Sequence, residues 1–427
     1  MPLSLNKNCI WVLALCLFLS LYWVQGRVGL GPGNQEWDYV EVRNGSHLFY
    51  WLLYTTANVR HFTHRPLVIW LQGGPGVASS GIGFFEQLGP IDIEGRLRET
   101  SWVHHVNVLI VDSPVGTGFA YVEDHGSYAT TNRRIALDLV ELMKQFLEKY
   151  PAFRNVPLHI FSESYGGKMA PEFALELHSA KKRGQVDCRL ESVVVGNPWT
   201  SPLDSVLSYA PYLLQMGIVD EDGYRRISRL SGQLAALVYD KQWLKALRKA
   251  SDVQDEISAS TGNVFIYNTQ RRVHEDEVYR YGEDKKMSDF MRTNVTRVLG
   301  LEKMPVWMDQ NSTVFESLYD DLFKPATHIV TRLLEETPIK VGIFSGTLDL
   351  LCATPGTVNW INRLKWSRRS EYARAHRTAF RIDGMLEGYE KHGGRLSMFW
   401  VLRAGHLVQQ DNPAAMAYIL KYFTEYE

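Results

Sequence analysis

The stretch that decides the fold is Leu158-His159-Ile160-Phe161-Ser162-Glu163-Ser164-Tyr165-Gly166-Gly167. Its first four residues form an apolar run typical of a buried strand, and a helix is predicted from Lys168 to Lys182. Between them lies a tight turn of small residues around Ser164. A serine at such a strand-to-helix turn is held exposed and ready to attack, with the N–H of the next residue directed into the same space. The stretch therefore predicts a nucleophilic serine.

Short apolar runs of the same kind recur along the chain, with helical stretches between them. These runs are His47–Tyr54, Leu67–Leu71, Val106–Val111, Leu158–Phe161, Val193–Val195, Ile339–Phe344 and Met398–Leu402. Between the third and the fourth run, Arg134–Tyr150 has apolar side chains at helical spacing, and Pro151 follows it. Strand, helix and strand in succession predict an α/β fold with a mostly parallel central sheet and helices on both faces.

The pattern changes between residues 201 and 337, where charges become dense and helical periodicity dominates. We expect a helical cap insertion there, placed over one end of a core formed by residues 27–200 and 338–427. In open α/β folds, ligands bind at the carboxyl ends of the strands, so the insertion is expected to cover the site. A closing helix is predicted near the C-terminus, with Asn412 as its N-cap and Pro413 at its first position.

A nucleophilic serine needs a general base and an acid that orients the base, and in such folds these follow in the order serine, acid, histidine. Asp349 follows the predicted strand 339–344, and His406 follows the predicted strand 398–402. Taken singly, Asp349 fits a turn cap and His406 fits a packed surface histidine. Their joint order and placement favour a catalytic triad of Ser164, Asp349 and His406.

The glycine-rich stretch Trp70–Gly76 follows another predicted strand. It is either a simple glycine-rich turn or the source of a second oxyanion-hole donor, the N–H of Gly74, beside the N–H of Tyr165. A phosphate-binding loop is disfavoured because no Gly-Lys-Ser or Gly-Lys-Thr follows. No cluster of cysteines and histidines has metal-ligand spacing, so we expect neither a metal nor another cofactor.

Composition excludes several classes of protein. The chain has 427 residues, of which 45% are hydrophobic and 22% charged, so disorder, collagen and coiled coil are excluded. The 46 basic and 47 acidic residues nearly balance, which argues against a nucleic-acid partner. With its 13 histidines protonated the chain would be strongly cationic, which fits an acidic compartment.

The first 26 residues resemble a signal peptide, because Lys7 precedes the apolar run Ile10–Trp23 and small residues follow. The alternative is a signal anchor; after cleavage no stable membrane span would remain.

Removal of the signal leaves two of the four cysteines, Cys188 and Cys352, which allow at most one disulfide, and their spacing does not favour it. Sequons at Asn44, Asn294 and Asn311 are compatible with glycosylation in the secretory pathway, on the way to secretion or to the lysosome.

Together these stretches resemble the serine carboxypeptidase family, in particular its retinoid-inducible and vitellogenic branch. The matching stretches lie between residues 37 and 411 and are Trp70–Gly76, Val111–Phe119, Phe161–Gly167, Ser345–Asp349 and Gly405–Val408. The resemblance implies an α/β-hydrolase fold with a helical cap and the removal of single residues from peptide or protein C-termini, usually at acidic pH. It also assigns the triad to Ser164, Asp349 and His406, and the oxyanion donors to Gly74 and Tyr165.

The resemblance further implies a site for the terminal carboxylate of the substrate, made by Gln72, Gly73, Glu163 and Glu86. The family has an asparagine where this chain has Gln72, which keeps the amide donor on a longer side chain. Glu86 matches a second glutamate of the family. In the family this glutamate shares a proton with the glutamate that precedes the serine, which is Glu163 in this chain. Two carboxyls in contact cannot easily both ionise, so we expect the pair to hold one proton in acid and donate a hydrogen bond to the substrate. Alternatively, the two glutamates are solvated on a helix face.

Two other functions remain open from the sequence. One is an acyltransferase or esterase that uses the same triad on other acyl groups. The other is a secreted binding protein with the same fold and no activity, which the intact triad disfavours. The oligomeric state and the preferred C-terminal residue are not determined by these patterns.

Overall fold

The computed structural model describes residues 26–124, 126–272 and 285–426. The predicted signal segment thus lies outside the described residues, apart from Gly26. Within the described part, no helix is both long and apolar enough to cross a bilayer.

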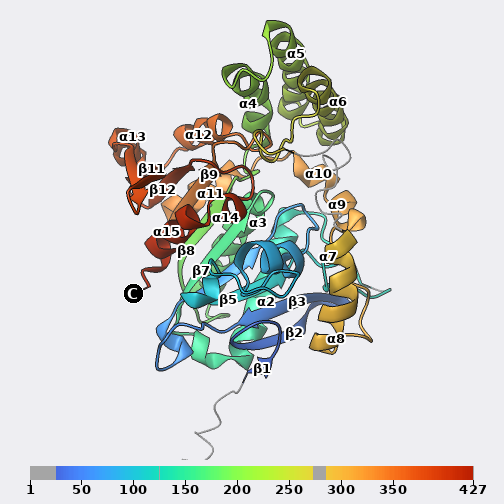
Figure 1. Cartoon of the computed structure of the whole chain (residues 1–427), viewed down its shortest axis with the longest axis vertical. Helices are drawn as coiled ribbons and strands as arrows, with labels where there is room; N and C mark the ends of the chain where they lie inside the picture. Colours follow the sequence, from blue (N-terminus) through green and yellow to red (C-terminus); the bar gives the residue numbers. More distant parts are fainter. Residues whose placement is uncertain (1–25, 125, 273–284, 427) are drawn as a thin grey trace, which may run out of the picture.

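One 12-stranded sheet runs through the molecule, in the order β1-β2-β3-β5-β4-β7-β8-β9-β12-β11-β10, with β6 paired to β3 (Figure 1). Its strands are β1 (Arg27–Val28), β2 (Asn34–Arg43), β3 (Ser46–Leu53), β4 (Leu67–Leu71), β5 (Asn107–Asp112), β6 (Tyr121–Val122), β7 (Pro157–Glu163), β8 (Arg189–Gly196), β9 (Lys340–Gly346), β10 (Thr378–Ile382), β11 (Met385–Gly393) and β12 (Leu396–Val401). The six central strands, β5, β4, β7, β8, β9 and β12, pair in parallel with their neighbours in this set. All the other strand pairs are antiparallel.

Each predicted apolar run forms a strand of this sheet, and the predicted α/β fold is confirmed. The strands that the sequence did not predict lie at the two edges, as in the β10–β11 hairpin. On β10, Phe380 is the only buried residue, so its sequence lacks the continuous apolar run that marks a strand buried on both faces. The central strands β4 and β5 are buried along their whole length.

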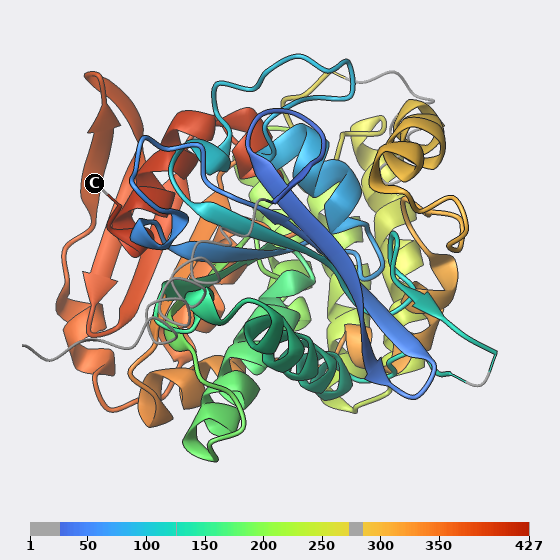
Figure 2. The same ribbon diagram turned by 90° about the horizontal axis from the view of Figure 1, so that it is seen from below.

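Helices cover both faces of the sheet (Figure 2). They are α2 (Asn132–Lys149), α3 (Gly166–Lys182), α4 (Pro202–Gln215), α5 (Glu221–Tyr239), α6 (Trp243–Thr261), α7 (Lys285–Phe290), α8 (Thr296–Leu299), α9 (Ser312–Ser317), α10 (Tyr319–Leu322), α11 (Thr327–Glu336), α12 (Thr354–Arg363), α13 (Arg369–Arg374), α14 (Val408–Asp411) and α15 (Pro413–Thr424). The π-helices are η2 (Ser79–Leu88) and η5 (Met291–Val295), and the 3₁₀ turns are η1 (Phe62–His64), η3 (Trp102–His104) and η4 (Pro151–Phe153). Helices α2, α3 and α11 pack on one face of the sheet, and η2 and α15 pack on the other.

Capping residues define the predicted helices. Helix α2 begins after Thr131, whose hydroxyl accepts a hydrogen bond from the N–H of Arg134 at 3.2 Å. The C-terminal helix α15 begins after Asn412, whose side chain accepts from the N–H of Ala415 at 3.0 Å, and Pro413 takes its first position. The predicted N-cap and the predicted first residue of this helix are confirmed.

The described residues between β8 and β9 contain helices and no strand of the sheet. Helices α4, α5 and α6 stand above the carboxyl ends of the parallel strands (Figure 1). Helix α11, by contrast, packs against α3 and β9 and so belongs with the layer that covers the sheet. The boundaries 201 and 337 of the cap insertion stay a prediction.

A histidine is buried inside the sheet. His159 on β7 is 2% exposed, and its Nδ1 lies 2.8 Å from Ser192 Oγ on the paired strand β8. Its Nε2 has no hydrogen-bond partner in the described structure. Burial lowers the pKa of His159 to about 3, because a buried imidazolium loses its hydration.

We expect His159 to make the fold sensitive to acid. The unfolded chain binds a proton at this imidazole below about pH 6.5, whereas the folded chain leaves it neutral down to about pH 3. Because the unfolded state binds more protons, stability falls as the pH drops through this window, by about 2 kcal/mol between pH 7 and pH 5.

Urea unfolding at these two pH values tests this expectation. His159→Asn, which cannot bind the proton, should lose about 2 kcal/mol less stability than the wild type between pH 7 and pH 5. The control His376→Asn changes an exposed histidine and should follow the wild type. If His159→Asn and the wild type lose the same stability, His159 is not the source of the acid sensitivity.

Candidate active site

Ser164 lies at the sharp turn between β7, which ends at Glu163, and α3, which begins at Gly166. Its backbone φ is 57°, which is uncommon for a residue other than glycine and occurs at strained turns. The N–H of Ser164 donates to the carbonyl of Gly196 at 2.9 Å, which ties the turn to the end of β8. On the other side, a Cβ on Gly73 would lie 2.6 Å from Ser164 Cβ, so only glycine fits there. The serine is thus held in the strained turn that the sequence predicted.

Asp349 and His406 are brought together by the turns that follow β9 and β12. Their side chains are buried, and His406 Nδ1 lies 2.8 Å from Asp349 Oδ2. The second oxygen, Asp349 Oδ1, accepts from the backbone N–H of Cys352 at 3.1 Å. Strands β7, β8, β9 and β12 pair in parallel, so Ser164, Asp349 and His406 all follow strand ends at the same edge of the sheet.

Asn197, which was not singled out from the sequence, holds together the loop that carries Asp349 and the loop that carries His406. Its Nδ2 donates to the carbonyls of Gly405 at 3.0 Å and of His406 at 2.5 Å. Its Oδ1 accepts from the N–H of Gly346 at 2.8 Å, at the start of the turn that carries Asp349. A signal was present, because Asn197 directly follows β8, at the sheet edge where the other site residues lie.

A segment that follows α6 also contacts both the loop of Asp349 and the loop of His406. The N–H of His406 donates to the carbonyl of Tyr267 at 2.6 Å, and the two rings meet edge to face at 5.3 Å between centroids. The neighbouring carbonyl of Ile266 accepts from the N–H groups of Leu350 and Leu351 at 3.0 and 3.2 Å. The residues after α6 therefore pack directly on the loops that position Asp349 and His406.

The two predicted oxyanion donors lie next to Ser164. Tyr165 directly follows it, and Gly74 follows Gly73, where an added Cβ would lie 2.6 Å from Ser164 Cβ. Neither the N–H of Gly74 nor that of Tyr165 donates to another group in the described part of the chain. Gly74 has φ of 112°, a conformation that L side chains rarely adopt. Both N–H groups are therefore available to a ligand.

Glu163, the residue before the serine, is buried and hydrogen-bonded by two amides. Its Oε1 accepts from Nε2 of Gln72 and, at 2.9 Å, from Nε2 of Gln87. Gln72 is itself oriented by Trp70, whose indole N–H donates to Gln72 Oε1 at 2.8 Å. Burial raises the pKa of Glu163 to about 7, against the opposing influence of His406 and the two amides. Glu163 therefore holds a proton in acid and loses it near neutrality.

The predicted sharing of a proton between Glu86 and Glu163 is wrong. The second oxygen, Glu163 Oε2, has no partner among the described residues, and Oε1 is bonded to amides. Glu86 instead accepts a hydrogen bond from Gln410 of α14 at 2.5 Å. Both Glu86 and Gln87 lie on the π-helix η2, and it is Gln87 that faces Glu163. The raised pKa of Glu163 thus results mainly from burial and not from a second carboxylate.

The pKa of His406 is raised above its ordinary value of 6.5. Burial lowers it, but the charge and the hydrogen bond of Asp349, together with the charge of Glu163, outweigh burial. From the sequence, burial and Asp349 are expected to shift this pKa in opposite directions, and which effect prevails is left open. At pH 5 the imidazole is therefore protonated in the resting site, and a rise in pH is needed for it to accept a proton.

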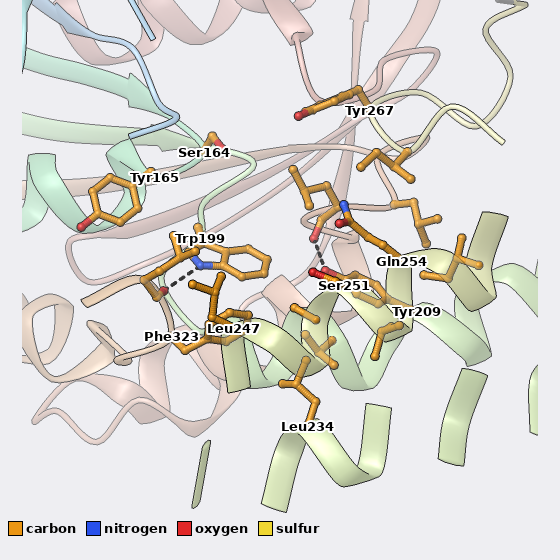
Figure 3. A pocket seen from close by; sticks show the side chains of 18 of the residues that line it. Ser164, Tyr165, Trp199, Tyr209, Leu234, Leu247, Ser251, Gln254, Tyr267 and Phe323 are labelled. Carbon is orange, nitrogen blue, oxygen red and sulfur yellow. Dashed lines mark hydrogen bonds between the residues drawn. The ribbon is translucent and has the colours of Figure 1, made fainter. Parts of the chain in front are cut away.

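A cavity of about 320 Å³ opens beside Ser164 and is lined by residues of α4, α5 and α6 (Figure 3). Ser164 and Tyr165 lie at one end and Leu234 of α5 lies at the other, as Figure 3 shows. Its other lining residues include Gly74, Trp199, Tyr209, Leu247, Ser251, Gln254, Tyr267 and Phe323. None of the described residues that line it carries a charge, so the cavity suits an apolar group.

One cluster of described residues has metal-like spacing, and it includes Asp349 and His406. Asp349, Cys352 and His406 each offer a ligand atom within 4.8 Å of the others. However, His406 Nδ1 is already hydrogen-bonded to Asp349. Cys352 and the distant Cys188 are both buried free thiols, and burial raises the pKa of each. The geometry therefore fits an acid–base pair better than a metal centre.

The three sequons differ in their accessibility. Asn44 and Asn294 are exposed. Asn311 is 4% exposed, its Nδ2 donates to the carbonyl of Gly116 at 2.7 Å, and its Oδ1 accepts from the N–H of Thr313 at 2.9 Å. The prediction of a glycan on Asn311 is therefore wrong for the folded chain, because the acceptor amide is buried and already bonded.

Comparisons with known proteins point in the same direction as this geometry. A family model described as serine carboxypeptidase matches residues 29–426. The human retinoid-inducible serine carboxypeptidase is 34% identical, over 100% of both chains. The vitellogenic carboxypeptidase of Aedes aegypti is 30% identical over 88% of this chain and 79% of that protein. The solved structure of Kex1(delta)p, a prohormone-processing carboxypeptidase from Saccharomyces cerevisiae, shares the fold with a TM-score of 0.81 at 22% identity, over 92% of this chain and 91% of that chain.

Proposed function

Because the chain belongs to the serine carboxypeptidase family, we propose that Ser164, Asp349 and His406 are the catalytic triad with which it removes amino acids from the C-termini of peptides. The observation that carries this proposal is the buried hydrogen bond of 2.8 Å between His406 and Asp349, at the sheet edge where Ser164 occupies its strained turn. A base that is oriented by a carboxylate, together with a serine that lines a cavity, is the arrangement that acyl transfer requires.

The reaction proceeds through an acyl-enzyme. Ser164 Oγ attacks the last peptide carbonyl, and His406 takes its proton and passes it to the nitrogen of the leaving amino acid. Asp349 holds the imidazole in the correct tautomer and stabilises its charged form. The negative oxygen of the tetrahedral intermediate accepts hydrogen bonds from the N–H groups of Gly74 and Tyr165. Water then attacks the ester, with His406 as the base, and releases the shortened peptide.

The terminal carboxylate of the substrate binds next to Glu163 in this proposal. An ionised Glu163 would repel it, but the raised pKa keeps Glu163 protonated below about pH 7. A protonated carboxyl donates a hydrogen bond, and Glu163 Oε2 has no partner in the described structure. The amide of Gln72 and the backbone of Gly73 complete the carboxylate site, while Gln87 orients Glu163.

The cavity beside Ser164 then receives the acyl side of the scissile bond. Its lining includes both oxyanion donors, Gly74 and Tyr165, and does not include Gln72, Glu163 or Gln87. The carboxylate site and the cavity are thus formed by different residues, and we place them on opposite sides of the reacting carbonyl. The apolar lining suits a large apolar side chain on the residue that precedes the C-terminal one.

Labelling with a fluorophosphonate that reacts with active-site serines tests this function. The wild type should be labelled and should hydrolyse N-blocked Phe-Leu, but not the same peptide with an amidated C-terminus. Ser164→Ala should abolish both labelling and hydrolysis, whereas the control Ser162→Ala, a buried residue of β7, should keep both. Preferential cleavage of esters or of the blocked peptide would favour an esterase or acyltransferase. Absence of labelling in folded protein would favour a non-catalytic binding protein.

The proposal also concerns where the enzyme acts. Exposed sequons at Asn44 and Asn294 support glycosylation at these two positions. Together with the signal-like residues 1–26, they support passage through the secretory pathway, with secretion or delivery to the lysosome as the destination.

A further inference from the structure

A buried ion pair joins the helix that follows Ser164 to the segment before α11. Lys168, in the first turn of α3, is 2% exposed, and its Nζ lies 2.7 Å from Oδ2 of Asp321 on α10. Lys168 Nζ also donates to the backbone carbonyl of Asp321. A second cation, Lys324, lies at the edge of this pair, 4.0 Å from Asp321 Oδ1. Two parts of the chain that are 153 residues apart are therefore joined at this point.

The same carboxylate also holds the residue that follows the nucleophile. The hydroxyl of Tyr165 donates to Asp321 Oδ2 at 3.1 Å, and the Lys168 ammonium lies 5.1 Å from the centre of the Tyr165 ring. The backbone carbonyl of Tyr165 accepts from the N–H of Lys168 at 2.9 Å. Tyr165 is thus held both by its side chain and by its carbonyl, while its N–H is left for a ligand.

Helix α10 is in turn a wall of the cavity. Leu322 and Phe323, directly after Asp321, line it. The indole N–H of Trp199 donates to the carbonyl of Leu322 at 2.9 Å, as Figure 3 shows, and the backbone N–H of Trp199 donates to the carbonyl of Ser164 at 2.8 Å. Asp321 therefore lies where the cavity wall meets the turn that carries the nucleophile.

Stability does not require an ion pair at this place. Burying two charges removes their hydration, and apolar residues of similar size often replace such pairs without loss of stability. The pair does, however, direct hydrogen bonds at fixed distances, which apolar side chains cannot do. We propose that Asp321 is a positioning residue, which through Lys168 and Tyr165 fixes both the oxyanion-hole backbone and the cavity wall formed by Leu322 and Phe323.

This inference rests on the proposed function, because it assigns the Tyr165 N–H to the oxyanion hole. It predicts two separate effects of losing the pair. Misplacement of the Tyr165 N–H lowers kcat for every substrate, since the donor acts on the transition state. Displacement of Leu322 and Phe323 raises KM only for substrates whose penultimate side chain fills the cavity.

The test is the double variant Lys168→Met/Asp321→Leu, assayed on N-blocked Phe-Leu and N-blocked Ala-Leu. We expect a thermal midpoint near that of the wild type and a fall in kcat of about tenfold on both peptides, less than the ~10²-fold loss of a whole oxyanion donor. KM should rise several-fold for the peptide with penultimate Phe and stay unchanged for the peptide with penultimate Ala. The rate of fluorophosphonate labelling should fall together with kcat.

The matched control is Arg43→Met/Asp138→Leu, which removes an ion pair of 2.8 Å between β2 and α2, away from the cap. It should keep wild-type kcat and KM on both peptides. A purely structural role for Lys168 and Asp321 would move the thermal midpoint and leave both kinetic constants unchanged. Wild-type kcat and KM in a folded Lys168→Met/Asp321→Leu enzyme would overturn the inference.

Failure of this inference is distinct from failure of the proposed function, which would appear as an unlabelled and inactive wild type. If the double variant does not fold, Tyr165→Phe tests the same inference. It removes the hydroxyl that donates to Asp321 and leaves the packing intact. Its kcat should fall about threefold, and its thermal midpoint should fall by no more than the loss of one hydrogen bond explains. An unchanged kcat in Tyr165→Phe would overturn the role of Asp321 in positioning Tyr165.

Discussion

Replacement of Asp349 by asparagine should lower kcat by about 10⁴-fold, with a much smaller change in KM. In the structure both carboxylate oxygens accept hydrogen bonds, Oδ2 from His406 Nδ1 and Oδ1 from the N–H of Cys352. An asparagine has only one oxygen, so its NH₂ group must face one of these two donors. If the NH₂ group faces His406, it forces the proton to Nε2, and the imidazole can no longer accept the proton of Ser164.

The measurement is steady-state hydrolysis of N-blocked Phe-Leu by purified Asp349→Asn. The control is Asp383→Asn, which changes an exposed aspartate in a turn with φ of 49°, a conformation that asparagine tolerates. The control should retain wild-type kcat. A loss of less than tenfold in Asp349→Asn would contradict the role of Asp349 as the residue that orients His406.

Glu163→Gln should remove the rise of KM toward alkaline pH. In the wild type, Glu163 is protonated below about pH 7 and donates to the substrate carboxylate. Above that pH the charged form repels the substrate, so KM should rise by up to about tenfold per pH unit. Glutamine keeps a hydrogen-bond donor at every pH, and KM for N-blocked Phe-Leu should stay nearly constant from pH 6 to pH 8.5. A pH dependence of KM identical to that of the wild type would contradict this role.

The same variant should remove the alkaline limb of kcat/KM and leave the acidic limb nearly in place. On the acidic side Glu163 is already protonated and uncharged, so its replacement by glutamine changes little around His406 there. Because Glu163 must hold a proton while His406 must not, the wild-type profile should be bell-shaped. The two apparent pKa values of this profile describe the coupled pair of Glu163 and His406, and neither can be assigned to one residue alone.

Two further measurements sharpen this test. The pKa of Glu163 rises from 4.5 in the unfolded chain to about 7 on folding, so the wild type loses stability as the pH rises through this window. Glu163→Gln should therefore be more stable than the wild type at pH 7, by about 2 to 3 kcal/mol. Gln87→Glu places a second carboxyl beside Glu163, and the rise of KM should then move to higher pH than in the wild type, because two carboxyls in contact hold their last proton more tightly than one.

The contact of Gln87 with Glu163 could not be predicted from the sequence. Glu86 and Gln87 are neighbours in the sequence, and matching to a family pattern selected the glutamate. The residues lie on a π-helix, whose i→i+5 bonding changes the direction in which successive side chains leave the axis. Which of the two faces Glu163 therefore depends on the backbone of η2 and on its packing against β4 and β5. No local pattern in the sequence determines this.

Asn311 and Asp321 illustrate the same limit. The sequon at Asn311 is a property of three adjacent residues, but its burial results from contact with Gly116, which is 195 residues away. Asp321 is an ordinary acidic residue in a short helix until the fold brings it to Lys168 and Tyr165. The roles of such residues follow from partners that are distant in the sequence.

By itself the sequence determined the parallel centre of the sheet, the turn at Ser164, the order of serine, aspartate and histidine after three strands, and the capped helix at the C-terminus. These features follow from local periodicity and turn chemistry, which act within a few residues. Only the tertiary structure decided which amides surround Glu163, why its pKa is high, which effect prevails on His406, and what lines the cavity. These depend on burial and on distances between segments far apart in the chain, since desolvation and charge act through space and not along the sequence.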